Sequence, residues 1–383
     1  MKIEKKGFIM IYFDNAASGG RKPDQVLSAL AASVKVCANP GRSGHKLSIA
    51  CATLVQDCRN ALNMFFDGYG FDRVVFTKNC TEALNIALLG VLKKGDHVVT
   101  TCMEHNSVLR PLEHLKKSGV ITYDVCPLDD EGNLSPADLV KLLKPNTAMV
   151  AITSASNVNG AIPPIAKIRQ TLPENVLLLC DGAQGCGHLD IRMKGVGIDL
   201  LCVAGHKGML GVQGSGALLF SERVDPNPIL FGGSGSMSIS LDAPDFYPDR
   251  LEAGTLSYPA IVSLLEGTRY LTLHLAQTQS RLLMLTAYFL RGLIALGKYT
   301  VYSIPNPCGI VAFKHKTLQS EYLADVLSAR YGIAVRGGLH CAPLMHEALG
   351  TLDGGLVRVS FSHFNSEREI DKLLAALKEI ANL

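Results

Sequence analysis

The sequence lacks the features that mark several broad classes of protein. It has no run of basic residues of the kind that nucleic-acid-binding proteins use, and its formal net charge is only +3. No apolar stretch approaches the length that a membrane-spanning helix needs. The apolar run near the N-terminus is too short for a signal peptide, and Met10 is a second candidate for the true start. We therefore expect a protein that binds neither nucleic acid nor membrane.

Cysteine is present, but not in the spacing of the common cysteine motifs. The sequence has eleven cysteines, an odd number, and no two of them form a C-x-x-C pair. Neither a zinc site nor a thioredoxin-like motif is therefore predicted, and we expect no metal. Most cysteines lie in apolar segments and read as small core residues, as at Cys51, Cys58, Cys180 and Cys202. This pattern fits a reducing environment, so we predict a cytoplasmic protein.

Short apolar runs alternate with helical patterns from Arg73 to Phe220. Such alternation predicts an α/β fold with a mainly parallel sheet and helices on both faces. Ligands of these sheets bind beyond the carboxyl ends of the strands. The expected strands are Val74–Thr77, His97–Cys102, Ile121–Val125, Ala148–Ser154, Val176–Cys180, Leu200–Val203 and Ala217–Phe220, with helices such as Thr81–Leu92 and Ser107–Ser118 between them.

The pattern changes after about residue 261. A long helical stretch, Val262–Leu296, leads into mixed strands and helices, and Ser366 with Glu369 forms a capping box that opens a final amphipathic helix. We expect a large α/β domain over residues 25–261 and a smaller α+β domain made of residues 1–24 and 262–383. The N-terminal segment would then fold back onto the C-terminal one.

Lys207 has the most informative surroundings in the sequence. The apolar run Leu200–Val203 reads as a buried strand, and Lys207 follows it closely. A lysine held at a strand end, out of bulk water, can form a Schiff base with an aldehyde cofactor. Asp181 lies at the end of another expected strand. Pyridoxal phosphate (PLP) needs this pair, because the lysine binds its aldehyde and a carboxylate keeps its ring nitrogen protonated.

Other polar residues also follow expected strands. Thr81 opens a helix whose N-terminal N–H groups suit a phosphate, and His105 could stack on a flat ring and relay protons. Asn157 and Gln184 could each hydrogen-bond a ring hydroxyl. Taken alone, each of these residues fits an ordinary structural role equally well. Their shared position at strand ends, together with Lys207 and Asp181, favours a cofactor site.

A second motif lies near the C-terminus, in the segment Arg336–Leu344. Two glycines before Cys341 and a proline after it predict a flexible, exposed loop. A thiol on such a loop can react, and Arg336 and His340 could favour its thiolate form. Arg358, on a short expected strand, could hold a substrate carboxylate in a bidentate contact, although a surface salt bridge is the simpler explanation for it.

With these motifs in place, the chain resembles the class V aminotransferase group of PLP enzymes and, within it, the NifS/SufS-like cysteine desulfurases. The resemblance runs from Tyr12 to the C-terminal helix, and the order and spacing of its short motifs make it specific. It implies the PLP-dependent transferase fold type I, which is aspartate aminotransferase-like. The motifs are Thr81-Glu82, Glu104-His105-Asn106, Ser156-Asn157, Asp181-Gly182-Ala183-Gln184, Gly205-His206-Lys207, Arg250 to Thr255, Arg336 to Ala342, and Arg358.

The resemblance also implies a role for each site residue. Lys207 would bind PLP and act as the base, Cys341 would be the nucleophile, and Arg358 would hold the substrate carboxylate, with Asn157 beside it. The remaining implied cofactor contacts are Asp181 at the ring nitrogen, His105 on the ring face, Gln184 and Asn157 at the ring hydroxyl, and His206, Thr81 and the residue at Cys80 around the phosphate. Thr255 would reach the phosphate of a neighbouring subunit, which implies a homodimer, and Arg42 matches a segment near its interface.

Two residues depart from the pattern of the family. Ala204 stands where many members have serine or threonine, and Cys80 stands where threonine is usual. The two lost hydroxyl contacts could cost about 1 kcal/mol each. We therefore expect PLP to be held less tightly here, although Lys207 and Asp181 should keep it bound.

The expected reaction converts L-cysteine to L-alanine and leaves sulfur on Cys341 as a persulfide, for delivery to an acceptor that the sequence does not identify. Two alternatives keep PLP: a selenocysteine lyase acting on L-selenocysteine, and a transaminase or epimerase in which Cys341 takes no part. A third is a cofactor-free binding or sulfur-carrier protein, against which the pair Lys207 and Asp181 argues. A Rossmann dinucleotide site is a poor fit, because the glycines do not form G-x-G-x-x-G.

Overall fold

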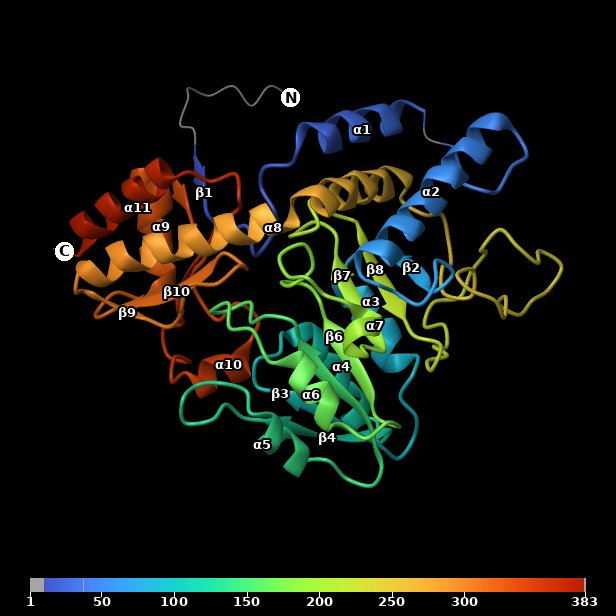
Figure 1. Ribbon diagram of the computed structural model, residues 1–383, viewed down its shortest axis with the longest axis horizontal. Coiled ribbons are helices and arrows are strands. Elements are labelled where there is room, and N and C mark those ends of the chain that lie inside the picture. The colour runs from blue at the N-terminus through green and yellow to red at the C-terminus, as the bar shows by residue number, and fades with distance from the viewer. Residues whose placement is uncertain (1–9, 37, 382–383) are drawn as a thin grey trace. The chain divides into compact units, whose positions relative to one another are not determined.

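The structure is a computed structural model, which describes residues 10–36 and 38–381 (Figure 1). The expectation about the start of the chain concerns residues 1–9, which lie outside the described residues. The chain forms two compact units. The larger consists of Lys22–Ser156 and Ile162–Leu275, and the smaller consists of Met1–Arg21, Asn157–Ala161 and Ala276–Leu383.

The larger unit is built around a seven-stranded sheet in the order β2-β8-β7-β6-β5-β3-β4. Its strands are parallel except for β8, which runs antiparallel to both β2 and β7. The fold class predicted from the sequence is confirmed, and each expected strand forms within a residue or so of its predicted bounds. The strands are β2 (Val74–Thr77), β3 (Asp96–Thr101), β4 (Ile121–Cys126), β5 (Thr147–Thr153), β6 (Leu177–Asp181), β7 (Leu200–Ala204) and β8 (Gly216–Phe220).

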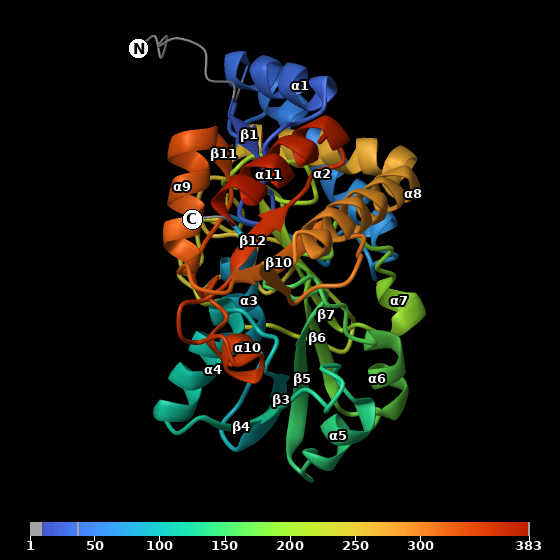
Figure 2. The same cartoon turned by 90° about the vertical axis from the view of Figure 1, so that its left-hand side faces the viewer.

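Helices cover both faces of this sheet, and Figure 2 shows α4 on one side of the strands and α6 on the other. The central strands are buried along their whole length, which explains why they read as continuous apolar runs rather than as alternating patterns. The helices are α1 (Asp24–Lys35), α2 (Lys46–Phe65), α3 (Cys80–Leu89), α4 (Asn106–Lys117), α5 (Pro136–Lys141), α6 (Ile165–Thr171), α7 (Met193–Val196) and the first part of α8 (Tyr258–Ala295).

The smaller unit combines a three-stranded antiparallel sheet with helices. Its sheet has the order β12-β10-β9, and a separate parallel pair joins β1 near the N-terminus to β11. The predicted capping box is present: the Ser366 side chain accepts from the Glu369 N–H, and the Glu369 carboxylate accepts from the Ser366 N–H. The elements are β1 (Ile11–Tyr12), β9 (Tyr299–Val301), β10 (Ile310–His315), α9 (Ser320–Tyr331), β11 (Ile333–Ala334), α10 (Pro343–Ala348), β12 (Val357–Ser360) and α11 (Glu367–Ile380).

The division between the units falls inside the helix α8, between Leu275 and Ala276. The sequence placed a boundary earlier in the same helix, after residue 261, because the change of pattern begins there. The short segment Asn157–Ala161 also joins the smaller unit, although strands of the larger unit flank it in sequence. In the described part of the chain, no helix is both long and apolar enough to cross a membrane.

Candidate active site

Asp181 ends strand β6 with its side chain almost fully buried, at 3% exposure. One carboxylate oxygen, Oδ1, accepts two hydrogen bonds, from the Ala183 N–H at 2.9 Å and from the Cys80 thiol at 3.3 Å. Both donors act on the same oxygen, so they fix the rotation of the carboxylate. This arrangement fits the protonated ring nitrogen of PLP.

Lys207 follows β7 in a tightly constrained turn. The Gly205 N–H donates to the Ser215 carbonyl at 3.0 Å, and the Gly211 N–H donates to the Gly205 carbonyl at 2.8 Å. A Cβ atom at Gly205 would lie 2.2 Å from Ser215 Oγ, so glycine is required there. The Lys207 charge acts on Cys80, whose thiol contacts Asp181, and this places Lys207 and Asp181 at one site. The pair predicted from the sequence therefore lies together.

Lys22 is a second lysine at this turn, and sequence analysis gave it no role. Its Nζ donates to the His206 carbonyl at 3.4 Å. Burial lowers the pKa of Lys22 to about 8. The Lys207 turn is thus tied to the segment that precedes α1. In the sequence, the one signal for Lys22 is its position just before Pro23, in a segment without an apolar pattern.

The N-terminus of α3 lies beside Asp181, since its first residue is Cys80. Asn79 caps the helix by accepting from the Glu82 N–H at 2.9 Å. Cys80 and Thr81 begin α3, and the first backbone N–H groups of an α-helix have no partner within the helix. A Cβ atom at Gly216 would lie 2.8 Å from the Asn79 carbonyl carbon, so β8 supports this turn closely. Free N–H groups at a helix N-terminus suit a phosphate.

His105 and Thr81 are linked through Ser107. Ser107 Oγ lies 2.9 Å from Thr81 Oγ1 and 2.9 Å from His105 Nδ1. The Ser107 N–H also donates to His105 Nδ1 at 3.0 Å, which makes Nδ1 an acceptor. In the neutral imidazole the proton therefore resides on Nε2. His105 caps α4 and is held in one orientation at the same sheet edge as Thr81.

Glu104 is a buried acid to which sequence analysis gave no role, although it belongs to the motif Glu104-His105-Asn106. It is fully buried, and its Oε1 accepts from Thr101 Oγ1 at 2.7 Å and from the Thr153 N–H at 2.9 Å. Its Oε2 has no partner among the described residues. Burial raises the pKa of Glu104 to about 8. The signal for it in the sequence was an acid directly after a buried apolar strand.

The remaining predicted cofactor residues of the larger unit occupy different surroundings. Gln184 is buried in the turn after Asp181, where its carbonyl contacts His188 Nδ1 at 2.8 Å. Ala204 ends β7 and packs in the core, and Cys80 directs its thiol to Asp181. Thr255 is exposed and lines a hollow beside the turn between β2 and α3.

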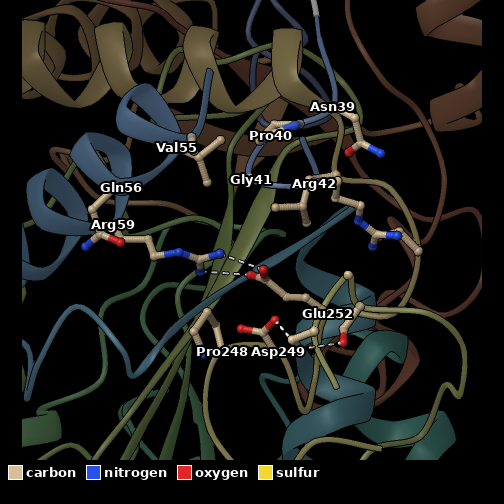
Figure 3. Close-up of a pocket in the computed structure, with 16 residues that line it drawn as sticks. Asn39, Pro40, Gly41, Arg42, Val55, Gln56, Arg59, Pro248, Asp249 and Glu252 are labelled. Atoms are coloured by element: carbon tan, nitrogen blue, oxygen red, sulfur yellow. Dashed lines mark hydrogen bonds and ion pairs between the residues drawn. The ribbon is translucent and has the colours of Figure 1, made fainter. Parts of the chain in front are cut away.

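A second cavity, of about 320 Å³, lies near Arg42 and Glu252 (Figure 3). Arg59 lines this cavity and donates two hydrogen bonds to the Glu252 carboxylate in a bidentate contact, at 2.8 and 2.6 Å. Arg42 donates to the carbonyls of Gly233 and Gly254, at 2.9 and 2.7 Å. The segment that carries Thr255 is thereby held by α2 and by the loop that precedes it.

In the smaller unit, the cysteine loop is anchored at its start and strained at its end. Arg336 and Arg358 exchange backbone hydrogen bonds, at 3.1 and 2.7 Å. A Cβ atom at Gly337 would lie 2.5 Å from the Ser320 carbonyl, so the loop runs close against the start of α9. His340 and Cys341 both adopt left-handed backbone conformations, with φ of 51° and 58°. Two successive non-glycine residues there store strain.

His340 is buried, and this changes one expectation about the thiolate. Burial, with the nearby Arg358, lowers the pKa of His340 to about 2, so the ring stays neutral. It stacks on His346, with ring centroids 5.7 Å apart. Arg336 brings positive charge to the sulfur, because its Nη2 lies 3.9 Å from Cys341 Sγ. Of the two residues expected to favour the thiolate, His340 therefore acts through packing.

Arg358 is held deep in the smaller unit, at 1% exposure. Its Nη2 contacts Asp14 at 2.9 Å and its Nη1 donates to the Asn157 carbonyl at 2.9 Å. Its Nε has no partner in the described chain. The Asn157 side chain in turn donates to the His340 carbonyl at 2.7 Å. Arg358, Asn157 and the cysteine loop, which are far apart in sequence, therefore form one connected group.

The sheet, the turn carrying Lys207 and the carboxylate that ends β6 define an α/β enzyme of fold type I. The chain belongs to the class V aminotransferase family, which matches residues 11–373. The members of this family are PLP-dependent enzymes, and the residues around Asp181 and α3 fit that cofactor. The family expected from the sequence is confirmed.

Individual relatives and a solved structure agree with this assignment. The chain is 30% identical to a cysteine desulfurase of Pectobacterium carotovorum subsp. carotovorum, over 99% of this chain and 95% of that one. It is also 30% identical to a protein of Methanothermobacter thermautotrophicus named "Probable cysteine desulfurase", over 97% of this chain and 95% of that one. The apo structure of the cysteine desulfurase from Thermococcus onnurineus superposes with a TM-score of 0.89 at 31% identity, covering 97% of this chain and 95% of that one.

Proposed function

We propose that the protein is a PLP-dependent cysteine desulfurase, a sulfurtransferase that converts L-cysteine to L-alanine and takes the sulfur onto Cys341 as a persulfide. The observation that carries this proposal is the position of Cys341. Of the ten cysteines in the described residues, nine are buried and Cys341 alone is exposed. It lies on a strained loop beside Arg336. The names of the relatives support the same activity.

The residues predicted from the sequence would hold the cofactor. Lys207 would bind its aldehyde and Asp181 its ring nitrogen, while His105 would lie on the ring. The remaining contacts would be the α3 N-terminus with Thr81 and His206 at the phosphate, and Gln184 and Asn157 at the ring hydroxyl. When bound, PLP supplies an electron sink for the carbanion that forms at the substrate α-carbon.

The residues of the chain perform the remaining steps. Lys207, as a free amine, removes the proton from the α-carbon, and a proton is returned to that carbon before alanine leaves. The Cys341 thiolate attacks the sulfur of the substrate, so that an S–S bond forms as the C–S bond breaks. The electron pair of the broken bond stays with carbon, which takes up a proton to become the methyl group of alanine. His105, which carries its proton on Nε2, is suited to supply it. An acceptor thiol then removes the sulfur from Cys341.

Arg358 and Asn157 would hold the substrate carboxylate. The guanidinium is already oriented by Asp14 and by the Asn157 carbonyl, and its Nε still lacks a partner in the described residues. A guanidinium fixed in this way offers a carboxylate a directed, charge-assisted contact. The link from Asn157 to the His340 carbonyl connects this contact to the cysteine loop.

A homodimer in the cytoplasm is part of the proposal. Thr255 is exposed, and the loop before it carries several exposed apolar side chains, among them Phe231, Ile239 and Leu241. Covering these residues with a second copy would remove them from water and would bring Thr255 to the partner's phosphate. The ten cysteines that the structure describes are all free, which fits a reducing compartment. Light scattering of the purified protein would test the dimer.

The test of the function is alanine release from L-cysteine by the purified, PLP-loaded protein, compared with the Cys341→Ala variant. Alanine from the wild type alone supports desulfuration through Cys341. Equal release from both would remove Cys341 from the mechanism and favour a transaminase- or epimerase-type enzyme. A much higher rate with L-selenocysteine that persists in the variant would instead indicate a selenocysteine lyase.

A further inference from the structure

Cys80 occupies a position whose structural role differs from the one that the sequence suggested. Its side chain was expected to affect the phosphate, because a hydroxyl is missing there. In the structure the thiol is buried, at 6% exposure, and donates to Asp181 Oδ1 at 3.3 Å. The Ala183 N–H donates to the same oxygen at 2.9 Å. The hydrogen bond joins residues that are 101 positions apart in the sequence.

The backbone of Cys80 is fixed by three features around it. Asn79 caps α3, Gly216 of β8 approaches the turn closely, and the face of the helix that carries Cys80 packs into the core. Burial and the adjacent Asp181 raise the pKa of the Cys80 thiol, so it keeps its proton and acts as a donor. The thiol therefore has one fixed place and one fixed role relative to the carboxylate.

We infer that Cys80 is a positioning residue that orients the Asp181 carboxylate and adjusts its basicity toward the ring nitrogen of the cofactor. This inference rests on the proposed use of PLP. A carboxylate that accepts a hydrogen bond is less basic, and a thiol is a weaker donor than a hydroxyl. Cysteine at this position therefore leaves Asp181 more basic than serine or threonine would, and the ring nitrogen retains its proton more firmly.

The alternative is that Cys80 only fills space in the core. Two variants separate these roles: Cys80→Ala removes the donor, and Cys80→Ser keeps a donor and strengthens it. Cys58→Ala is the matched control, since Cys58 is an equally buried cysteine, on α2, without a contact to Asp181 among the described residues. The readouts are the dissociation constant of PLP, the visible absorption of the bound cofactor, and the ¹⁵N chemical shift of PLP labelled at the ring nitrogen.

If Cys80 positions Asp181, Cys80→Ala weakens PLP binding by about three- to tenfold, within the range for an ordinary hydrogen bond. Cys80→Ser restores binding and moves the ¹⁵N shift in the direction opposite to Cys80→Ala. Cys58→Ala changes neither. Wild-type binding and spectra in Cys80→Ala would overturn the inference. Equal losses in Cys80→Ala and Cys80→Ser would also overturn it, because they indicate packing alone.

Failure of this inference can be told apart from failure of the proposed function. If the wild-type protein binds PLP and releases alanine but Cys80→Ala behaves like the wild type, only the inference falls. If PLP binds with the expected pattern of variants but no alanine forms, the inference stands and the desulfurase proposal falls. If the wild-type protein shows no visible cofactor absorption after incubation with PLP, both fall.

Discussion

The region around Asp181 and the loop at residues 336–343 both contain cysteine, but the cysteines of the two regions have opposite properties. Around Asp181 the thiols of Cys80, Cys180, Cys186 and Cys202 are buried, and burial raises the pKa of each. On the loop, Cys341 is exposed and lies beside a guanidinium. The same side chain therefore serves as a neutral packing or donor group in one region and as a candidate nucleophile in the other. The surroundings decide which.

The largest expected difference between the two regions is in thiol reactivity. Iodoacetamide should modify Cys341 at the rate of an accessible thiol. The four thiols around Asp181 should react at least about 10³ times more slowly, because they require the structure to open first. Peptide mass mapping over time would measure each site, with denatured protein as the control in which all sites react alike. If any of these four thiols were labelled as fast as Cys341, the expected difference in accessibility between the two regions would be wrong.

Because Glu104 is fully buried, it should make a pH-dependent contribution to the free energy of unfolding. Its pKa is raised to about 8 in the folded state, from an ordinary value of 4.5. The stabilisation that the protonated Glu104 carboxyl gives to the folded state is fully present below pH 4.5 and is lost as pH rises through 8. Over that range the free energy of unfolding of the wild type should fall, relative to Glu104→Gln, by up to about 5 kcal/mol.

Urea unfolding of the wild type and Glu104→Gln at pH 5 and pH 9 would measure this effect. The glutamine keeps the oxygen that accepts from Thr101 and Thr153, so its variant serves as a matched neutral form. Parallel stability curves for the two proteins would show that Glu104 ionises as it does in water. Water would then reach Glu104 more readily than its burial in the structure indicates.

The smallest expected effect concerns the charge beside Cys341. Removing it in Arg336→Met should slow alkylation of Cys341 by about two- to fivefold at neutral pH, since one exposed ion pair contributes less than about 1 kcal/mol. Arg336→Lys should retain most of the rate, and high salt should reduce the difference between the proteins. A rate that is unchanged in Arg336→Met at low salt would contradict a role for this charge.

The strands could be predicted from the sequence because each signal is local. The central strands are buried on both faces, so they read as continuous apolar runs, and Asp181 and Lys207 could be placed at strand ends for the same reason. The glycines and proline around Cys341 pointed to a reactive loop, and the resemblance to a known family then gave Cys341 and Arg358 their roles. The sequence also predicted the capping box at Ser366, because its two bonds lie within one helical turn.

The contacts that could not be predicted are those between distant segments. The bond from Cys80 to Asp181 depends on how α3 packs on the sheet, which no local pattern encodes. The glycines around Cys341 predicted a flexible loop, yet His340 is buried and strained within it. The bond from Asn157 to the His340 carbonyl similarly places Asn157 in the smaller unit, with the cysteine loop.

The central claim is that sulfur passes to the exposed cysteine and to none of the buried ones. The most direct measurement is the mass of each cysteine-containing peptide after the PLP-loaded protein is incubated with L-cysteine and its thiols are trapped. The account predicts one added sulfur atom on the peptide that contains Cys341 and on no other. Added sulfur on a peptide that contains Cys80, Cys180, Cys186 or Cys202 would contradict it. So would alanine release with an unmodified Cys341 peptide.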